Sequence, residues 1–123
     1  MSTTAKAAEK DVESLLLRAG WITSVPSIDA GIDIVAMKGS RVIRVQVKSC
    51  GRQQPDGSYR FDLRKKTKSG LRAPRDWSAE VDYVFFVADS RLVWAAKSCE
   101  CVKSAVHLRE GDCLSALPQE IFA

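Results

Sequence analysis

Four polar residues, Glu9, Asp33, Gln46 and Lys48, are spaced so that they could gather around a phosphodiester bond. Glu9 falls in a helical pattern, whereas the other three lie in two runs of β-branched residues. Carboxylates are hard oxygen ligands for Mg²⁺, which keeps several waters and takes further ligands from a substrate phosphate. A lysine ammonium beside them can orient or help to deprotonate an attacking water and stabilise charge in the transition state. These residue types are suited to phosphodiester cleavage.

Residues 31–48 predict the β-hairpin that must hold three of these side chains. Two β-branched runs flank Gly39 and Ser40, and glycine at the first central position of a two-residue loop is typical of a type II′ turn. Pairing about this turn places Asp33 opposite Gln46. Because strand side chains alternate between faces, one face is apolar and the other carries the polar residues. The apolar face holds Ile34, Ala36, Ile43, Val45 and Val47, and the polar face holds Asp33, Val35, Val42, Arg44, Gln46 and Lys48.

Residues 2–18 predict an amphipathic helix that packs on the sheet and ends at Gly20. At about 100° per residue, Glu9 falls at the edge of the apolar stripe and Glu13 lies one step nearer solvent. Glu9 is therefore the better-placed inward carboxylate, although the pattern alone also fits an exposed surface glutamate. The stripe consists of Ala5, Ala8, Val12, Leu15, Leu16 and Ala19.

The rest of the chain predicts strands at 21–25, 58–63, 81–88 and 91–96. The nearly continuous apolar run 81–88 is typical of a strand buried on both faces, so it should be central. We expect strand 58–63 beside the hairpin, a helical turn at 77–80, and short helices over 98–106 and after Asp112. The expected fold is α/β, with a central mixed sheet of about five strands flanked by helices in the order αβββ(β)αβ.

Length and composition indicate a single domain that covers residues 1–123. No apolar run approaches the roughly 18 to 20 residues of a membrane span, and the N-terminus lacks the apolar core of a secretory signal. We therefore expect a cytoplasmic protein with no membrane partner. The single histidine, His107, and the cysteines do not have the spacing of a zinc site, so we interpret the thiols as reduced. The cysteines are Cys50, Cys99, Cys101 and Cys113.

Positive charge is concentrated in residues 41–75. This stretch holds eleven Lys and Arg residues against Asp56 and Asp62, whereas the whole chain has a net charge of +4. Local basicity of this kind predicts a polyanion such as DNA as partner, although charge alone fits a solvated loop equally well. The candidate DNA-binding residues are Arg44, Arg52, Arg60, Arg64, Lys65, Lys66, Lys68, Arg72 and Arg75.

The order of Glu9, the segment 31–36 (Gly-Ile-Asp-Ile-Val-Ala) and the segment 45–48 (Val-Gln-Val-Lys) resembles the PD-(D/E)XK nuclease superfamily. Within it, the chain is most similar to archaeal and phage Holliday junction resolvases and to intron-encoded homing endonucleases that carry a glutamine variant of the motif. The resemblance covers residues 5–50 well and extends to about residue 96. It implies a restriction-endonuclease-like fold and a bacterial, archaeal or phage origin.

The resemblance also implies roles for individual residues. Glu9 matches a helix-one glutamate that assists the metal site, Asp33 matches the metal-binding aspartate, and Lys48 matches the catalytic lysine. The backbone carbonyl of Val47 usually completes the metal shell. Gln46 departs from the common Glu or Asp at its position, and its neutral amide oxygen should weaken Mg²⁺ binding by removing one negative charge.

The resemblance thus implies a DNA endonuclease that uses Mg²⁺, with Mn²⁺ as a substitute, and leaves 5′-phosphate and 3′-hydroxyl ends. The chain is too small for a separate reader domain, which favours a structure-specific enzyme similar to a Holliday junction resolvase, acting as a homodimer or higher homo-oligomer. A homing or restriction-type endonuclease with sequence specificity is the second interpretation. The third is a catalytically silent DNA-binding module with a nuclease fold, which Gln46 supports.

Neutralising Lys65, Lys66 and Lys68 should flatten the salt dependence of DNA affinity. Each lost phosphate contact reduces the number of counterions that are released when the protein binds DNA. The measurement is the slope of log affinity against log salt concentration. An unchanged slope would remove this loop from the DNA interface.

Overall fold

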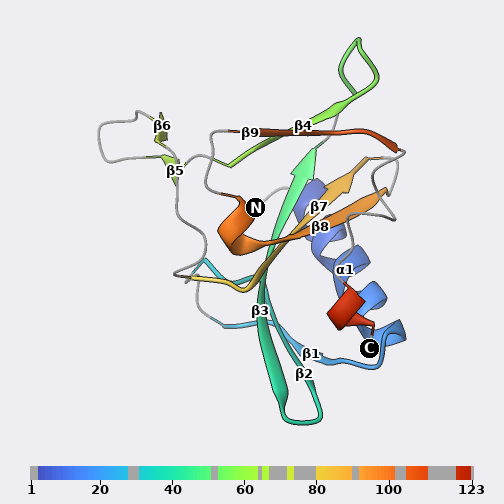
Figure 1. The fold of residues 1–123 in the computed structure, drawn as a ribbon, viewed down its shortest axis with the longest axis vertical. Helices are drawn as coiled ribbons and strands as arrows, with labels where there is room; N and C mark the ends of the chain where they lie inside the picture. The colour runs from blue at the N-terminus through green and yellow to red at the C-terminus, as the bar shows by residue number, and fades with distance from the viewer. Residues whose placement is uncertain are drawn as a thin grey trace.

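The computed structural model describes residues 3–27, 31–50, 53–63, 65–66, 72–73, 80–89, 92–101, 105–110 and 119–122. Figure 1 shows the elements, which in chain order are α1 (Thr3–Arg18), β1 (Ile22–Ser24), β2 (Ile34–Lys38), β3 (Arg41–Cys50), β4 (Tyr59–Asp62), β5 (Lys65–Lys66), β6 (Arg72–Ala73), β7 (Tyr83–Ala88), β8 (Val93–Lys97), the 3₁₀ turn η2 (Ser98–Glu100), β9 (Ala105–Leu108) and the 3₁₀ turn η4 (Gln119–Ile121). No helix in these ranges is long and apolar enough to cross a membrane.

Five strands form the central sheet in the order β1-β2-β3-β7-β8. The β3–β7 pair is parallel and the other pairs are antiparallel, so the sheet is mixed. All six residues of β7 are buried, as expected for a strand covered on both faces. The predicted α/β fold with a mixed sheet of about five strands is therefore confirmed.

The β2–β3 hairpin has the predicted register. Ile34 pairs with Val45 and Lys38 with Arg41, so the turn falls at Gly39 and Ser40. Gly39 has a φ of +62°, which the first central position of such a turn requires. The predicted apolar face is also confirmed, because Ile34, Ala36, Val45 and Val47 are buried.

Helix α1 covers that apolar face of the sheet, and its Ala8, Val12 and Leu16 join the core cluster formed there. The helix ends at Gly20, whose φ of +96° is the left-handed conformation that closes many helices. The Lys38 Nζ atom donates to the Ala19 carbonyl oxygen at 2.7 Å, which ties the hairpin to the end of the helix.

The strand predicted at 58–63 does not join the central sheet, which corrects its expected position beside the hairpin. It forms β4 and pairs with β9 as a separate two-stranded sheet. Its buried side chains pack onto the second face of the central sheet, where the Phe61 and Phe86 rings meet edge to face with centroids 5.1 Å apart. This two-stranded layer, drawn across the upper part of Figure 1, takes a place that we expected a helix to fill.

The helix predicted over 98–106 is also wrong. Among the described residues of this segment, helical structure is limited to the turn η2 (Ser98–Glu100), and strand β9 begins at Ala105. The predicted helical turn at 77–80 and the helix after Asp112 lie largely outside the described residues. Within the described ranges, α1 is the one α-helix that flanks the sheet.

The C-terminal turn η4 closes the core beside α1. Ile121 is 1% exposed, and its carbonyl oxygen accepts a hydrogen bond of 2.6 Å from the Trp21 indole. The Tyr83 hydroxyl donates to Glu120 at 2.7 Å, and burial together with this carboxylate raises the pKa of Tyr83 to about 12. The last described residues thus join β1 to β7.

Replacing Ile121 with alanine should lower the free energy of unfolding by about 2 to 5 kcal/mol, because it removes a fully buried side chain and leaves a cavity. Urea unfolding measures this loss. The neighbouring Phe122 is 47% exposed and provides a matched control, since Phe122→Ala should change the unfolding free energy by less than about 1 kcal/mol. Equal losses in the two variants would contradict a role for η4 in closing the core.

Candidate functional site

The candidate site lies where β2 begins and the backbone pairing between β2 and β3 stops. The Asp33 amide donates to the Val45 carbonyl oxygen at 2.9 Å. One step further along β3, the Val47 amide donates to the Asp33 carboxylate at 2.8 Å. A side-chain oxygen thus occupies the position that a backbone carbonyl would fill if the ladder continued. This hydrogen bond holds the carboxylate against the edge of β3.

Helix α1 brings a second carboxylate to the same place. Glu9 is 8% exposed, so it points inward, whereas the helical pattern alone also fitted an exposed surface glutamate. Burial raises the pKa of Glu9, and the negative charge of Asp33 raises it further, whereas Lys6 and Lys10 act in the opposite direction. Each carboxylate therefore lies within the field of the other, and their repulsion would be relieved by a cation between them.

Gln46 supplies an oxygen that no described residue satisfies. Its Nε2 donates to the Val47 carbonyl oxygen at 3.4 Å, while its Oε1 is buried and accepts no hydrogen bond from the described residues. Since the amide and carbonyl of one residue point to the same edge of an antiparallel strand, the Val47 carbonyl lies on the edge where Asp33 binds. A buried amide oxygen without a donor is costly unless something else binds it.

These oxygens fit a magnesium ion. Within the described ranges, no group of three or more His, Cys, Asp and Glu side chains gathers to hold a metal. The donor set here is different, because it combines two carboxylates with an amide oxygen and a backbone carbonyl. Such an all-oxygen set with few charges is typical of Mg²⁺ sites, in which waters and substrate phosphate provide the other ligands.

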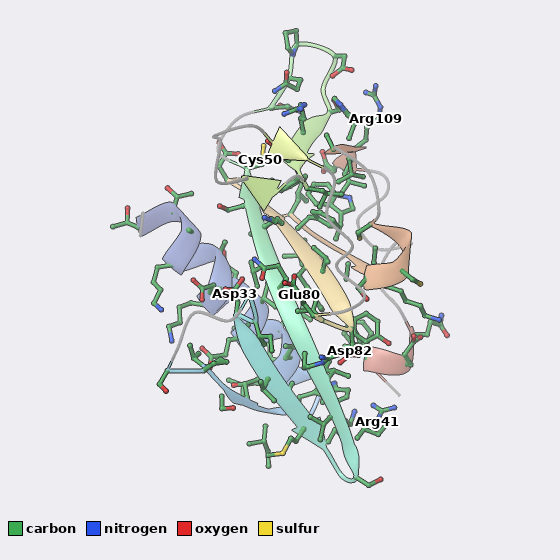
Figure 2. All side chains as sticks on the ribbon, turned by 90° about the vertical axis from the view of Figure 1, so that its left-hand side faces the viewer. Asp33, Arg41, Cys50, Glu80, Asp82 and Arg109 are labelled. Atoms are coloured by element: carbon green, nitrogen blue, oxygen red, sulfur yellow. The ribbon has the colours of Figure 1, made fainter. Side chains whose placement is uncertain are left out.

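Lys48 follows on the same strand face as Gln46. Both side chains are partly buried, and β3 is held on its other edge by the parallel strand β7, where Lys48 pairs with Phe86. Rigid pairing on a central strand keeps the ammonium in a defined direction relative to the carboxylates. In Figure 2, Asp33 lies beside the middle of β3, with α1 passing behind the hairpin.

Asp82 is a residue of the site region that the sequence did not reveal. It accepts from the Arg44 amide at 2.8 Å, and its carboxylate forms an ion pair with the Arg44 guanidinium at 3.3 Å. Burial acts to raise the pKa of Asp82, but the hydrogen bonds from the Arg44 side chain and backbone outweigh burial and lower it. The signal in the sequence was an aspartate directly before a buried strand, but its partner, Arg44, lies 38 positions away in the chain.

The predicted DNA-binding residues are only partly within the described structure. Arg44 is 41% exposed at its side chain even though it pairs with Asp82, and Arg60 is exposed on β4. Lys65, Lys66 and Arg72 lie in the short β5–β6 hairpin, of which the backbone is described. The remaining four, Arg52, Arg64, Lys68 and Arg75, lie outside the described residues.

Comparison with known proteins gives a family and a fold. A family model described as PD-(D/E)XK endonuclease matches residues 1–121. Among solved structures, the bacterial homing endonuclease I-Ssp6803I is similar, with a TM-score of 0.76 and 23% sequence identity over 97% of this chain and 86% of that one. No curated protein sequence matches. At this identity the structural likeness shows the fold alone.

Replacing Glu9 with glutamine should stabilise the metal-free protein at neutral pH. The folded-state pKa of Glu9 lies above its ordinary value, so the ionised carboxylate favours the unfolded state. The wild-type protein should therefore lose stability relative to Glu9→Gln as the pH rises from the ordinary pKa through the raised one. Urea unfolding across this pH range in EDTA measures the difference. A wild-type protein that gains stability relative to Glu9→Gln over the same range would contradict the raised pKa.

Proposed function

Because the chain belongs to the PD-(D/E)XK endonuclease family, we propose that it is a Mg²⁺-dependent endonuclease that hydrolyses phosphodiester bonds in double-stranded DNA. One observation carries the proposal: the Asp33 carboxylate, bound to the Val47 amide at 2.8 Å, shares its surroundings with the inward Glu9. Two carboxylates in one another's electrostatic field, one of them buried with a raised pKa, favour a bound cation over a purely structural role.

Four oxygen donors would hold the metal: the carboxylates of Glu9 and Asp33, the Val47 carbonyl and the amide oxygen of Gln46. Bound there, Mg²⁺ would polarise the phosphate and favour deprotonation of a water. Gln46 contributes no charge, so two carboxylates rather than three would neutralise the charge of the metal. The buried Oε1 without a donor supports its use as a ligand.

Lys48 has a separate task beside these ligands. Its ammonium would orient the attacking water, favour loss of that water's proton to solvent through its positive charge, and stabilise the charge that develops on the phosphate in the transition state. Phosphoryl-group chemistry depends chiefly on such positioning and charge stabilisation. The position of Lys48 on a central strand, one residue after the Val47 carbonyl, supports this role.

Double-stranded DNA is the substrate that we favour. The homing endonuclease with the similar fold supports this choice, although a four-way junction remains the substrate of the resolvase interpretation. Cutting both strands of a duplex requires two sites, so we propose that the protein acts as a homodimer or higher homo-oligomer. The rival interpretation is a silent DNA-binding module, in which Gln46 has replaced an essential acid.

Cutting should require Lys48 and the charge of Asp33. Lys48→Ala and Asp33→Asn should each reduce cutting of supercoiled plasmid in Mg²⁺ by at least about a hundredfold, because the first removes a positive charge beside the reacting phosphate and the second weakens the binding of Mg²⁺. Asparagine keeps an acceptor for the Val47 amide, so DNA binding measured in EDTA should stay largely intact. Lys97→Ala, at a side chain that is 57% exposed on β8, is the matched control and should cut normally.

The same assay separates the candidate functions. A panel of duplex, four-way junction, flap and single-stranded substrates, each with Mg²⁺, Mn²⁺ or EDTA, identifies the preferred DNA. Binding without cutting of every substrate in both metals would leave the silent module as the function. Loss of binding in proportion to cutting would mean that Lys48 and Asp33 are structural.

Restoring an acid at position 46 should strengthen metal binding. Gln46→Glu adds a third carboxylate, so half-maximal cutting should occur at a lower Mg²⁺ concentration, and Mg²⁺ should raise the melting temperature of this variant more than that of the wild type. Titration of cutting and of melting temperature with Mg²⁺ measures both. An unchanged Mg²⁺ requirement would remove position 46 from the metal site.

A further inference from the structure

Asp82 binds both the backbone and the side chain of Arg44. Its Oδ2 atom accepts from the Arg44 amide at 2.8 Å and from Nε at 3.4 Å, and its Oδ1 atom accepts from Nη2 at 3.3 Å. The Asp82 amide in turn donates to the Arg44 carbonyl oxygen at 2.8 Å. A carboxylate thus takes the place of a backbone acceptor on this edge of β3, as Asp33 does for Val47 on the other edge. Figure 2 shows Asp82 beside β3, between Arg41 near the hairpin turn and Asp33 toward the middle of the strand.

The backbone fixes the Asp82 carboxylate more firmly than the guanidinium does. The contact with the Arg44 amide has the length of an ordinary hydrogen bond, whereas the two side-chain contacts exceed the usual range of about 2.7 to 3.2 Å. The two side chains are 41% and 40% exposed, and an ion pair that is exposed to this degree contributes little to stability. The side-chain pair therefore orients the guanidinium without adding much to the free energy of unfolding.

The Arg44 guanidinium keeps donors for another anion. A guanidinium has five N–H groups in a planar fork, and Asp82 accepts from one on Nε and one on Nη2. No described residue accepts from the remaining groups, which lie on Nη1 and Nη2. A guanidinium that is held along one edge presents its other edge in the geometry that binds two phosphate oxygens.

Arg44 lies on the same face of β3 as Gln46 and Lys48. Val47 belongs to the core cluster beneath α1, whereas Cys50 packs against the cluster on the other face, so the even-numbered positions of β3 share that second face. At about 3.3 Å per residue, the Arg44 and Lys48 backbones are about 13 Å apart. Duplex DNA carries a phosphate for about every 1.7 Å of its axis when both strands are counted. A duplex with one phosphate at Lys48 therefore has others within reach of Arg44.

We propose that Arg44 binds a DNA phosphate that flanks the one at Lys48, and that Asp82 is the positioning residue that directs the guanidinium toward it. The contact is made to the DNA backbone, so it adds affinity and fixes the register of the duplex without reading its sequence. This proposal rests on the proposed function, because it takes the DNA substrate of that site.

The negative charge of Asp82 separates a positioning role from simple electrostatics. An acid near a DNA interface repels phosphates, so its neutralisation by itself raises the affinity for DNA. Neutralising an acid that orients Arg44 has the opposite effect, because the guanidinium is then no longer held toward the phosphate. The sign of the change in affinity therefore distinguishes the positioning role from a pair that only joins β3 to the start of β7.

The test is binding of the full chain to a labelled linear duplex in EDTA over a series of salt concentrations. Asp82→Asn should weaken binding by about three- to tenfold although it removes a negative charge. Arg44→Ala should weaken binding and lower the slope of log affinity against log salt concentration by about 1, and adding Asp82→Asn to it should cause no further loss. Glu120→Gln is the matched control, since this carboxylate is 46% exposed in an ion pair with Lys97, and its affinity should stay within about twofold of the wild type.

A second variant keeps the aspartate in place. Asp82→Asn retains an oxygen that can accept from the Arg44 amide, and urea unfolding checks that this variant folds. Arg44→Lys retains the positive charge, but an ammonium cannot bind Asp82 and a phosphate along two edges of one planar group. Its affinity for the duplex should fall by about threefold or more while the salt slope stays unchanged.

The outcomes separate this proposal from the proposed function. An Asp82→Asn variant that binds the duplex as tightly as the wild type, or more tightly, overturns the proposal, and so does an Arg44→Lys variant with wild-type affinity. A further loss from Asp82→Asn in the Arg44→Ala background would assign Asp82 a purely structural role. Cutting in Mg²⁺ is measured in parallel. The expected pattern of binding in a protein that cuts no DNA would support the positioning role and remove the endonuclease activity alone.

Discussion

The hydrogen bond from the Val47 amide to the Asp33 carboxylate decides where the hairpin ends and where the site begins. The Asp33 side chain takes the place of the next backbone acceptor. The chain before β2 can therefore diverge from β3 without leaving the Val47 amide unpaired. The same bond orients the carboxylate along the strand edge that carries the Val47 carbonyl. Strand pairing and ligand placement are therefore one constraint, and both depend on the register set by the turn at Gly39 and Ser40.

The site also brings two carboxylates into one another's electrostatic field. Helix α1 delivers Glu9 into a buried position beside Asp33, and this burial, with the negative charge of Asp33 as the second cause, raises the pKa of Glu9. A glutamate at position 46 would add a third negative charge. The amide of Gln46 avoids that repulsion in the metal-free protein, but it leaves an oxygen without a donor among the described residues. The proposed metal would satisfy this oxygen and both carboxylates together.

The packing of the described elements leaves part of one face of the sheet uncovered. Helix α1 and the turn η4 cover one face, and the β4–β9 pair packs over the central strands of the other face. The described elements leave the outer side of β1, β2 and the beginning of β3 open, and the candidate site lies at the border of this open area.

The sequence by itself determined the hairpin, its register and the two faces of its strands, because turn chemistry and side-chain periodicity act between residues close in the chain. The helical pattern left Glu9 open to an exposed or an inward position. Only the tertiary structure decided that β4 pairs with β9 rather than with the hairpin, although Tyr59 and Phe61 had the right alternation. The same holds for the pairing of Arg44 with Asp82 and for the unsatisfied oxygen of Gln46. These features depend on which distant segments meet, and local patterns carry no information about that choice of partner.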